Sequence, residues 1–83
     1  PFNASTGIAY RLDKDENILL EIYSANGQKV RTLFEGLASA GFHSIEWNGT
    51  DERGTAVASG VYFCHLSINQ SPFFSSRKVI LIK

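Results

Sequence analysis

Apolar and polar residues alternate along most of this chain, and a period of two is the pattern of a β-strand with one buried face. In the segment 8–12, Ile8 and Leu12 fall on the same face as Tyr10, with polar or small residues between them. In the segment 18–23, Leu20 and Ile22 share a face in the same way. The alternation predicts strands. A helix is plausible only within residues 35–40, where it would be a single turn.

Strand-like segments recur at intervals of roughly 8–12 residues, as they do in all-β sandwiches and barrels. They are 8–12, 18–23, 28–34, 42–47, 56–58, 61–68 and 73–82, of which 56–58 is expected to be a short edge strand. Polar turns separate them at 13–17, 48–55 and 69–72, and the small residues of 36–41 predict a crossing between sheets. We therefore expect an all-β fold, an immunoglobulin-like antiparallel β-sandwich of about seven strands.

Asn26-Gly27 stands between two of these segments and is the strongest short hairpin signal in the chain. A type I′ turn needs positive φ at both central positions, which asparagine and glycine tolerate. The sequence therefore predicts a hairpin that joins 18–23 to 28–34, with Val30 as a buried residue of the return strand.

Tyr62 stands two residues before Cys64 at the start of a strand, which is the tyrosine-corner pattern of immunoglobulin sandwiches. In such a corner the tyrosine hydroxyl donates a hydrogen bond backward to the backbone. Tyr62, Cys64 and Leu66 share a face, and we expect them to point inward. On an earlier core strand Ile45 and Trp47 share a face, and the Trp47 ring is expected to pack against Cys64.

Cys64 is the only cysteine, so it cannot form an internal disulfide or by itself build a structural zinc site. The partner cysteine of an antibody domain is absent, and we expect Leu20 or Ile22 to fill its place. We interpret Cys64 as a small buried hydrophobic residue, and the alternative is a reactive or intermolecular thiol.

A length of 83 residues allows one domain, which we take to span residues 1–83. Eight basic and eight acidic residues give a net charge of zero, and the bases are scattered apart from Arg77-Lys78, which argues against nucleic acid as a partner. No apolar run approaches the roughly 20 residues of a membrane-spanning segment, and no signal peptide is recognisable. Because the chain begins at Pro1 without a methionine, we expect an excised domain or a processed product.

Side chains that could support catalysis or metal binding are sparse. His43 is expected to flank the core and His65 to lie on a sheet surface, whereas a catalytic triad needs a histidine beside a nucleophile in a cleft. We therefore predict no enzymatic activity, no catalytic residue, no metal site and no cofactor. Asn48, Asp51 and Glu52 crowd one turn. They suit a calcium site or, more simply, Asx-turn hydrogen bonds to the backbone, and the sequence leaves both interpretations open.

Five segments, in order, resemble the C-terminal sorting domain of type IX-secreted proteins and the related immunoglobulin-like domain of flagellar hook-capping proteins. They are Pro1-Phe2-Asn3-Ala4-Ser5-Thr6, Ile22-Tyr23-Ser24-Ala25-Asn26-Gly27-Gln28-Lys29-Val30, Ala40-Gly41-Phe42-His43-Ser44-Ile45-Glu46-Trp47-Asn48-Gly49 with Asp51 and Gly54, Ala58-Ser59-Gly60-Val61-Tyr62, and Arg77-Lys78-Val79-Ile80-Leu81-Ile82-Lys83. The resemblance covers nearly the whole chain and rests on order and spacing. Two residues depart from it: Ala4 stands where the family often has proline, and Cys64 where it often has an aromatic residue.

The resemblance implies a module at the C-terminus of a larger secreted or cell-surface protein of a Gram-negative bacterium. The outer-membrane secretion machinery recognises such modules and is the expected partner. The ending in Lys83 favours the sorting branch over the hook-cap branch. The resemblance implies recognition or turn roles for Gly27, Lys29, Val30, Gly60, Tyr62, Lys78 and Lys83.

Two further functions stay open. One is a structural or assembly module, such as a filament subunit, an adhesive spacer or a hook-cap-type domain, which pairs with neighbouring domains, subunits or copies of itself through exposed edge strands. The segment 79–82 is apolar on both faces and suits burial between chains. The other is a carbohydrate-binding module, for which Tyr23, Phe42 and Phe63 are the candidate aromatic residues.

Overall fold

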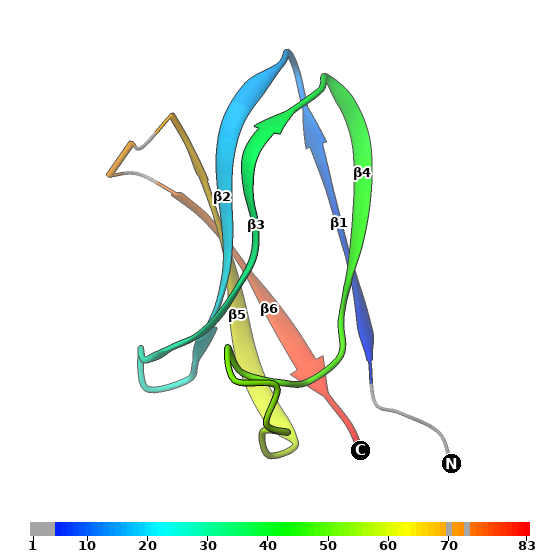
Figure 1. Cartoon of the computed structure of the whole chain (residues 1–83), viewed down its shortest axis with the longest axis vertical. Helices are drawn as coiled ribbons and strands as arrows, with labels where there is room; N and C mark the ends of the chain where they lie inside the picture. Colours follow the sequence, from blue (N-terminus) through cyan, green and yellow to red (C-terminus); the bar gives the residue numbers. More distant parts are fainter. Residues whose placement is uncertain (1–4, 70, 73) are drawn as a thin grey trace.

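Six antiparallel strands make up the part of the chain that the computed structural model describes, which is residues 5–69, 71–72 and 74–83 (Figure 1). They are β1 (Thr6–Leu12), β2 (Glu16–Ser24), β3 (Lys29–Ala38), β4 (Gly41–Trp47), β5 (Gly60–Ile68) and β6 (Phe74–Leu81). The all-β, immunoglobulin-like architecture expected from the alternation is confirmed. No helix that could cross a membrane occurs among these residues. Of the segments quoted for the resemblance, positions 1–4 lie outside the described residues, as does Phe73 of the expected last strand.

Six strands are found among the described residues where about seven were expected, and the difference lies at 56–58. The expected edge strand at 56–58 is reduced to a single bridge between Thr50 and Ala56. The segment is too short to form a ladder, and instead it lies in the long connection between β4 and β5. No helical turn forms at 35–40, the one place where a helix was plausible, because β3 continues through Ala38. The crossing between sheets is therefore confined to residues 39–40, where Asp15 Oδ1 accepts the Ala40 N–H at 2.8 Å.

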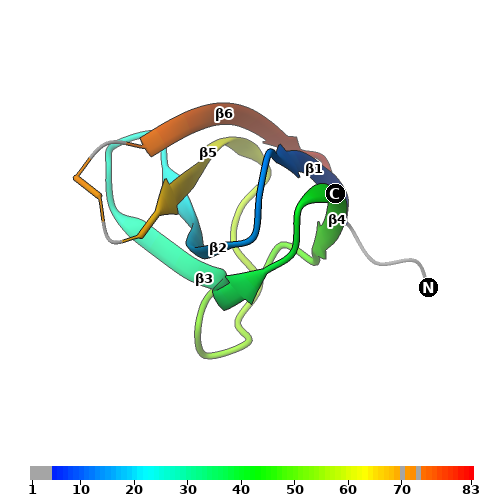
Figure 2. The ribbon, with the colours of Figure 1, turned by 90° about the horizontal axis from the view of Figure 1, so that it is seen from above.

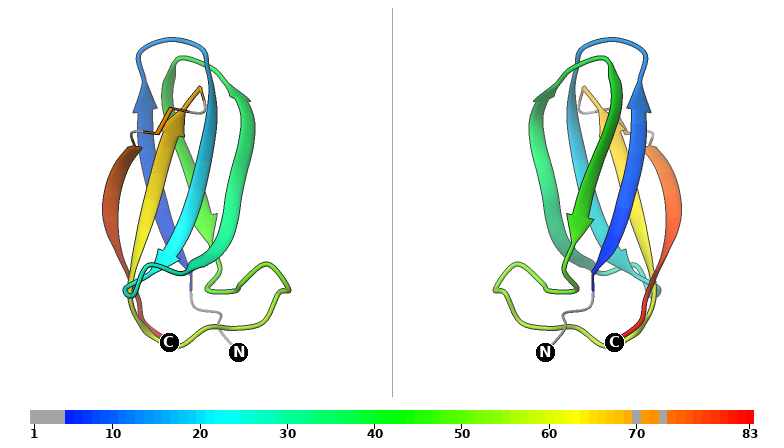
Figure 3. Two further views of the ribbon diagram at one scale, coloured as in Figure 1. Left: turned by 90° about the vertical axis from the view of Figure 1, so that its left-hand side faces the viewer. Right: turned by 90° about the vertical axis from the view of Figure 1, so that its right-hand side faces the viewer.

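The strands form two sheets that face each other across the core (Figure 2). β1 pairs with β4, and the other sheet has the order β3-β2-β5-β6. The β1–β2, β3–β4 and β5–β6 connections lie at one end of the sandwich, while the β2–β3 turn, the 48–59 connection and the C-terminus lie at the other (Figure 3). At one side of the sandwich Arg77 of β6 donates a hydrogen bond to the carbonyl of Ala9 in β1, at 2.5 Å.

The β2–β3 hairpin forms as predicted, but its turn is not of type I′. Gly27 has φ of 89°, whereas Asn26 does not lie at positive φ. The Ser24 N–H donates to the Gln28 carbonyl at 2.8 Å, and the Gly27 N–H donates to the Ser24 carbonyl at 3.0 Å. Three residues therefore form the loop, with glycine in the left-handed position that a three-residue hairpin requires.

Two register shifts bend β3 against β2, between Leu20 and Glu21 and between Ile22 and Tyr23. Each shift places an extra residue on β3, so its side chains do not alternate strictly between core and solvent. As a result Val30, Leu33 and Phe34 all pack against the core. Val30 is half-buried, although the sequence pattern predicted a buried residue.

The core centres on Trp47, Leu20, Ile22 and Leu81, the largest side chains that are fully buried. Tyr62 and Cys64 belong to the same buried cluster, and Ile45 packs against it while half-buried. The Trp47 ring contacts the Tyr62 ring, and Cys64 belongs to the same buried cluster as both.

The comparison with antibody domains misplaced the neighbour of Cys64. Ile22 is the direct cross-strand partner of Cys64 within one sheet, because β2 pairs with β5. Neither Ile22 nor Leu20 therefore occupies the place across the sandwich that a disulfide partner would take. Ile8 and Tyr10 of β1 share a small cavity with Cys64 there.

Candidate functional site

The face of the β3-β2-β5-β6 sheet that points away from the core is the candidate site, and we call it the outer face. The strand register aligns four of its residues in one row across all four strands: Lys29, Tyr23, Phe63 and Lys78. Two lysines therefore flank two aromatic rings, and we call this set the basic–aromatic row. Both Lys29 and Lys78 were recognition candidates, although they are far apart in the sequence.

Glu21 lies beside this row and is only 9% exposed although it is on the outer face. Its Oε2 pairs with Lys29 Nζ at 3.1 Å, and its Oε1 accepts a hydrogen bond from the Tyr23 hydroxyl at 3.3 Å. The hydrogen bond with Glu21 raises the pKa of Lys29 above its ordinary value. Burial, and then the Glu21 charge, raise the pKa of the Tyr23 hydroxyl. The side chains of Lys29 and Tyr23 thus hold one carboxylate in a fixed position on this face.

Three rings stack across the outer face next to Glu21. His65 lies between Tyr23 and Phe74, with ring centroids 4.4 Å and 4.2 Å apart and interplanar angles of 24° and 22°. Because the rings use their flat faces against one another, they offer mainly their edges to a ligand. Sugar recognition by stacking needs open ring faces, so this arrangement does not favour the carbohydrate-binding interpretation.

The aromatic residues proposed for carbohydrate binding do not lie on one surface. Tyr23 and Phe63 are neighbours on the outer face, whereas Phe42 lies on β4 in the other sheet. Phe42 is 84% exposed, and the Arg11 guanidinium lies 5.7 Å from its ring centroid.

Aliphatic side chains continue the outer face toward the end where the C-terminus lies. Val61 of β5 is paired with Ile80 of β6, and they are 40% and 53% exposed. Ile82, just beyond β6, is also exposed. The segment 79–82 therefore buries Val79 and Leu81 and leaves its other apolar residues in solvent. Exposed apolar surface of this extent marks a contact site more often than free surface.

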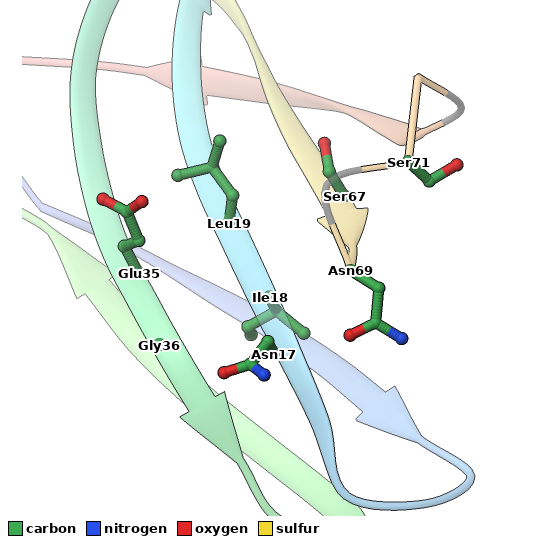
Figure 4. A pocket seen from close by; sticks show the side chains of 8 residues that line it. All are labelled: Asn17, Ile18, Leu19, Glu35, Gly36, Ser67, Asn69 and Ser71. Carbon is green, nitrogen blue, oxygen red and sulfur yellow. The ribbon is translucent and has the colours of Figure 1, made fainter.

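At the opposite end of the same face lies a hollow of about 610 Å³ (Figure 4). Leu19 lies between Glu35 of β3 and Ser67 of β5, which are its neighbours in the register. Residues of the β5–β6 turn and the start of β2 complete the wall; the full lining is Asn17, Ile18, Leu19, Glu35, Gly36, Ser67, Asn69 and Ser71. The outer face is thus hollowed about four positions along β2 from the basic–aromatic row.

The remaining recognition candidates lie at the end of the sandwich that carries the C-terminus. The Tyr62 hydroxyl donates to the Ala58 carbonyl at 2.5 Å, the backward hydrogen bond of a tyrosine corner. The Lys83 N–H donates to Ser59 Oγ at 3.1 Å, which ties the last residue to the start of β5. Gly60 opens β5. Gly27 lies in the β2–β3 turn and Val30 packs against the core, so the seven candidates do not form one site.

The groups weighed for catalysis are not brought together. Burial raises the pKa of the Cys64 thiol to about 11, so the thiolate is scarce at neutral pH. His43 stacks on Tyr10, and its Nε2 lies 2.6 Å from the Ser39 carbonyl oxygen. His65 is held between two rings on the outer face, on the opposite side of its strand from Cys64.

The oxygen atoms weighed for calcium are engaged within the 48–55 turn or by β3. Asp51 Oδ1 accepts the N–H groups of Arg53 and Thr55 at 2.9 Å and 3.0 Å. Glu52 Oε2 accepts the Thr32 N–H at 2.9 Å, which covers part of the β3 edge. These contacts fit the Asx-turn interpretation. Within the described part of the chain, no three acidic, histidine or cysteine side chains lie close enough together to hold a metal ion.

Residues 3–71 match the family described as the FlgD Ig-like domain. The strands β1 to β5 fall within the match, whereas β6 lies beyond it. No curated protein matches the chain.

Solved structures with the same fold include two FlgD proteins. One is FlgD from Xanthomonas campestris, whose structure is described as giving insights into the hook capping essential for flagellar assembly. It has a TM-score of 0.70 and 25% identity over 95% of this chain. FlgD from P. aeruginosa follows with a TM-score of 0.69 and 21% identity over 93% of this chain. This chain spans 56% and 61% of those two proteins. The dimeric latent PorU from Porphyromonas gingivalis has a TM-score of 0.68 and 21% identity over 96% of this chain, which spans 8% of PorU.

Proposed function

Because the chain belongs to the FlgD Ig-like domain family, we propose that it is a non-enzymatic docking module of a larger exported protein. The observation that carries the proposal is the basic–aromatic row. Lys29 and Lys78 come from segments 49 positions apart (78 − 29) and meet in one row with Tyr23 and Phe63 between them. The aromatic and aliphatic side chains suit the centre of a contact with another protein, and the two lysines suit its polar rim.

We propose further that the module directs its parent protein through type IX secretion to the surface of a Gram-negative bacterium. Two features support this version: the order of the five sequence segments, and the position of Lys78 and Ile80 on β6, outside the FlgD family match. In this proposal the outer-membrane secretion machinery recognises the outer face. The turns at Gly27, Gly60 and Tyr62 and the chain end at Lys83 hold that face in shape.

A reporter fusion tests the sorting proposal. Residues 1–83 are joined to the C-terminus of a periplasmic reporter in a host with type IX secretion and in a matched strain that lacks it. We expect reporter at the cell surface or in the medium only in the competent host. Retention in the periplasm of both strains would exclude sorting.

Two lysine variants test whether the row is the recognised surface. Lys78→Ala is expected to reduce export at least fivefold, whereas Lys14→Ala is the matched control, because Lys14 is exposed in the β1–β2 turn. Equal export of both variants would show that the row is not recognised, even if sorting itself takes place.

An assembly module in a hook-cap-type protein is the second candidate. The family match and the likeness to a FlgD that caps the hook favour it. The test replaces the corresponding domain of the Xanthomonas campestris FlgD with this chain and counts assembled flagella. Restored assembly supports this candidate, and loss of assembly together with export of the reporter supports sorting.

A further inference from the structure

The outer face carries complementary features at its two ends. One end is the basic–aromatic row, and the other end is the row that the register forms from Glu35, Leu19, Ser67 and Phe74, which we call the hollow row because its first three residues line the hollow. The two rows lie four positions apart on β2, which is about 13 Å along a strand. The middle row contains Glu21, His65 and Ser76.

A two-fold axis along the middle row, between two copies that meet face to face, brings each basic–aromatic row over the other copy's hollow row. Each strand then lies over its own counterpart. This operation sets Lys29 of one copy over Glu35 of the second copy, and Tyr23 over Leu19. Glu35 and Leu19 both line the hollow (Figure 4). An isologous contact of this kind repeats every favourable pairing twice.

The charges favour this pairing. Glu35 is exposed and makes no ion pair with any described residue, and Lys29 keeps 46% of its side chain exposed although it contacts Glu21. On the other edge of the face, Lys78 of one copy lies over Phe74, which is 52% exposed. A two-fold axis along the strands would instead set Lys29 over Lys78, which repel each other.

The area of the outer face limits the affinity expected for the dimer. Four strands of eight residues present about 500 Å² of sheet per copy, less than the roughly 800 Å² per partner of a standard stable interface. The contact is therefore expected to be reversible and to need protein concentrations of hundreds of micromolar, or a high local concentration on a cell surface.

We propose that the outer face is a self-complementary docking surface, in which the hollow around Leu19 and Glu35 receives the basic–aromatic row of a second copy. The partner is thus another molecule of this chain, bound by its sheet face rather than by its edges. The inference goes beyond the proposed function and does not depend on the secretion route, because it is tested on the isolated 83-residue chain.

Sedimentation equilibrium up to 1 mM measures the dimer. We expect Glu35→Lys to raise the dimer dissociation constant at least tenfold, with Glu35→Gln in between. Glu46→Lys makes the same charge change at an exposed position on β4 of the other sheet and is expected to leave the dissociation constant unchanged. A chain that stays monomeric at 1 mM, or equal effects of the two lysine variants, would overturn the proposal. Thermal melting of each variant checks that it is folded.

Cysteine crosslinking tests the axis independently. Ser76 lies in the middle row, so a cysteine there faces its own counterpart, and Ser44 is an exposed serine on the other sheet. In a Cys64→Ala background, Ser76→Cys is expected to form the intermolecular disulfide at least fivefold faster than Ser44→Cys. Equal rates would mean random collision, and faster crosslinking at position 44 would place the contact on the wrong sheet.

Discussion

The indole of Trp47 meets the ring of Tyr62 edge to face, with ring centroids 5.0 Å apart and 72° between their planes. Each of the two side chains also donates a hydrogen bond to a backbone carbonyl. Trp47 Nε1 donates to the Thr50 carbonyl at 2.9 Å, and the Tyr62 hydroxyl donates to the Ala58 carbonyl. The pair therefore ties the long β4–β5 connection to the core at two points, which matters because that connection contains almost no ladder of its own.

Removing the hydroxyl of Tyr62 should loosen the second of these anchors. Tyr62→Phe keeps the ring contact with Trp47 and loses one hydrogen bond, so we expect the free energy of unfolding to fall by about 1 kcal/mol. Urea denaturation measures it. Tyr10→Phe is the control, because the Tyr10 hydroxyl makes no hydrogen bond with the described residues. A loss for Tyr62→Phe no larger than the control would show that the corner does not stabilise the fold.

Gly49 should resist substitution for two separable reasons. Its φ is +75°, and a Cβ there would lie 3.1 Å from Leu81 Cδ2. Gly54 has φ of +81°, but a Cβ at that position would meet nothing within 4 Å, so Gly54→Ala measures the backbone cost alone. We expect about 1 kcal/mol for Gly54→Ala and about 2–3 kcal/mol for Gly49→Ala, since the second variant also crowds the core. Equal losses in thermal or urea unfolding would show that Leu81 moves aside freely.

The Cys64 thiol should react slowly with alkylating reagents in the folded protein. Its ionisation should also lower the free energy of unfolding at high pH. Burial raises its pKa from 9.0 to about 11, so the folded state favours the protonated thiol. The protonated Cys64 thiol therefore makes its full contribution to the free energy of unfolding below pH 9, and this contribution is lost as the pH rises from 9 toward 11. Alkylation by iodoacetamide at pH 8 should be at least a hundredfold slower than in urea. Cys64→Ala should unfold with less dependence on pH in that window, and fast alkylation of the native chain would contradict the prediction.

Lys29→Ala should destabilise the fold, because it leaves the nearly buried Glu21 carboxylate without its cation. We expect a loss of about 1 kcal/mol, since Lys29 is itself half-exposed and water screens the pair. The pKa of Lys29 is raised from 10.5, so the Lys29–Glu21 pair makes its full contribution to the free energy of unfolding at neutral pH and loses it above pH 10.5. Urea unfolding of the variant and the unchanged chain at pH 7 and pH 11 measures the loss at each pH. Lys14→Ala is the control, and an equal loss at both pH values would show that charge is not the cause.

The alternation of residues predicted most strands and the faces of their side chains. Ile8, Leu12, Leu20 and Ile22 are buried as their phase indicates, because the side-chain period of a strand is set locally. The errors arose where the backbone departs from that period. Val30 lies at a register shift, and Ala56 forms a single bridge because its segment is too short for a ladder.

The candidate site could be predicted only in part. The resemblance pointed to Lys29 and Lys78, but Glu21 and His65 were not singled out as binding residues. Their position on the polar side of their strands could be read from alternation. Alternation could not show which strands are neighbours. The pairing of β2 with β5 joins segments about 40 residues apart, and it depends on both strands burying their apolar faces in the same core.

The amino-acid sequence alone therefore determined that this chain is built of short strands with one buried face, and that Tyr62 and Trp47 belong to its core. Only the tertiary structure decided the strand order β3-β2-β5-β6, and with it the row from Lys29 to Lys78 and the hollow at Leu19. The physical reason is that the side-chain direction within a strand depends on neighbouring residues, whereas the register between strands depends on which distant apolar faces pack together.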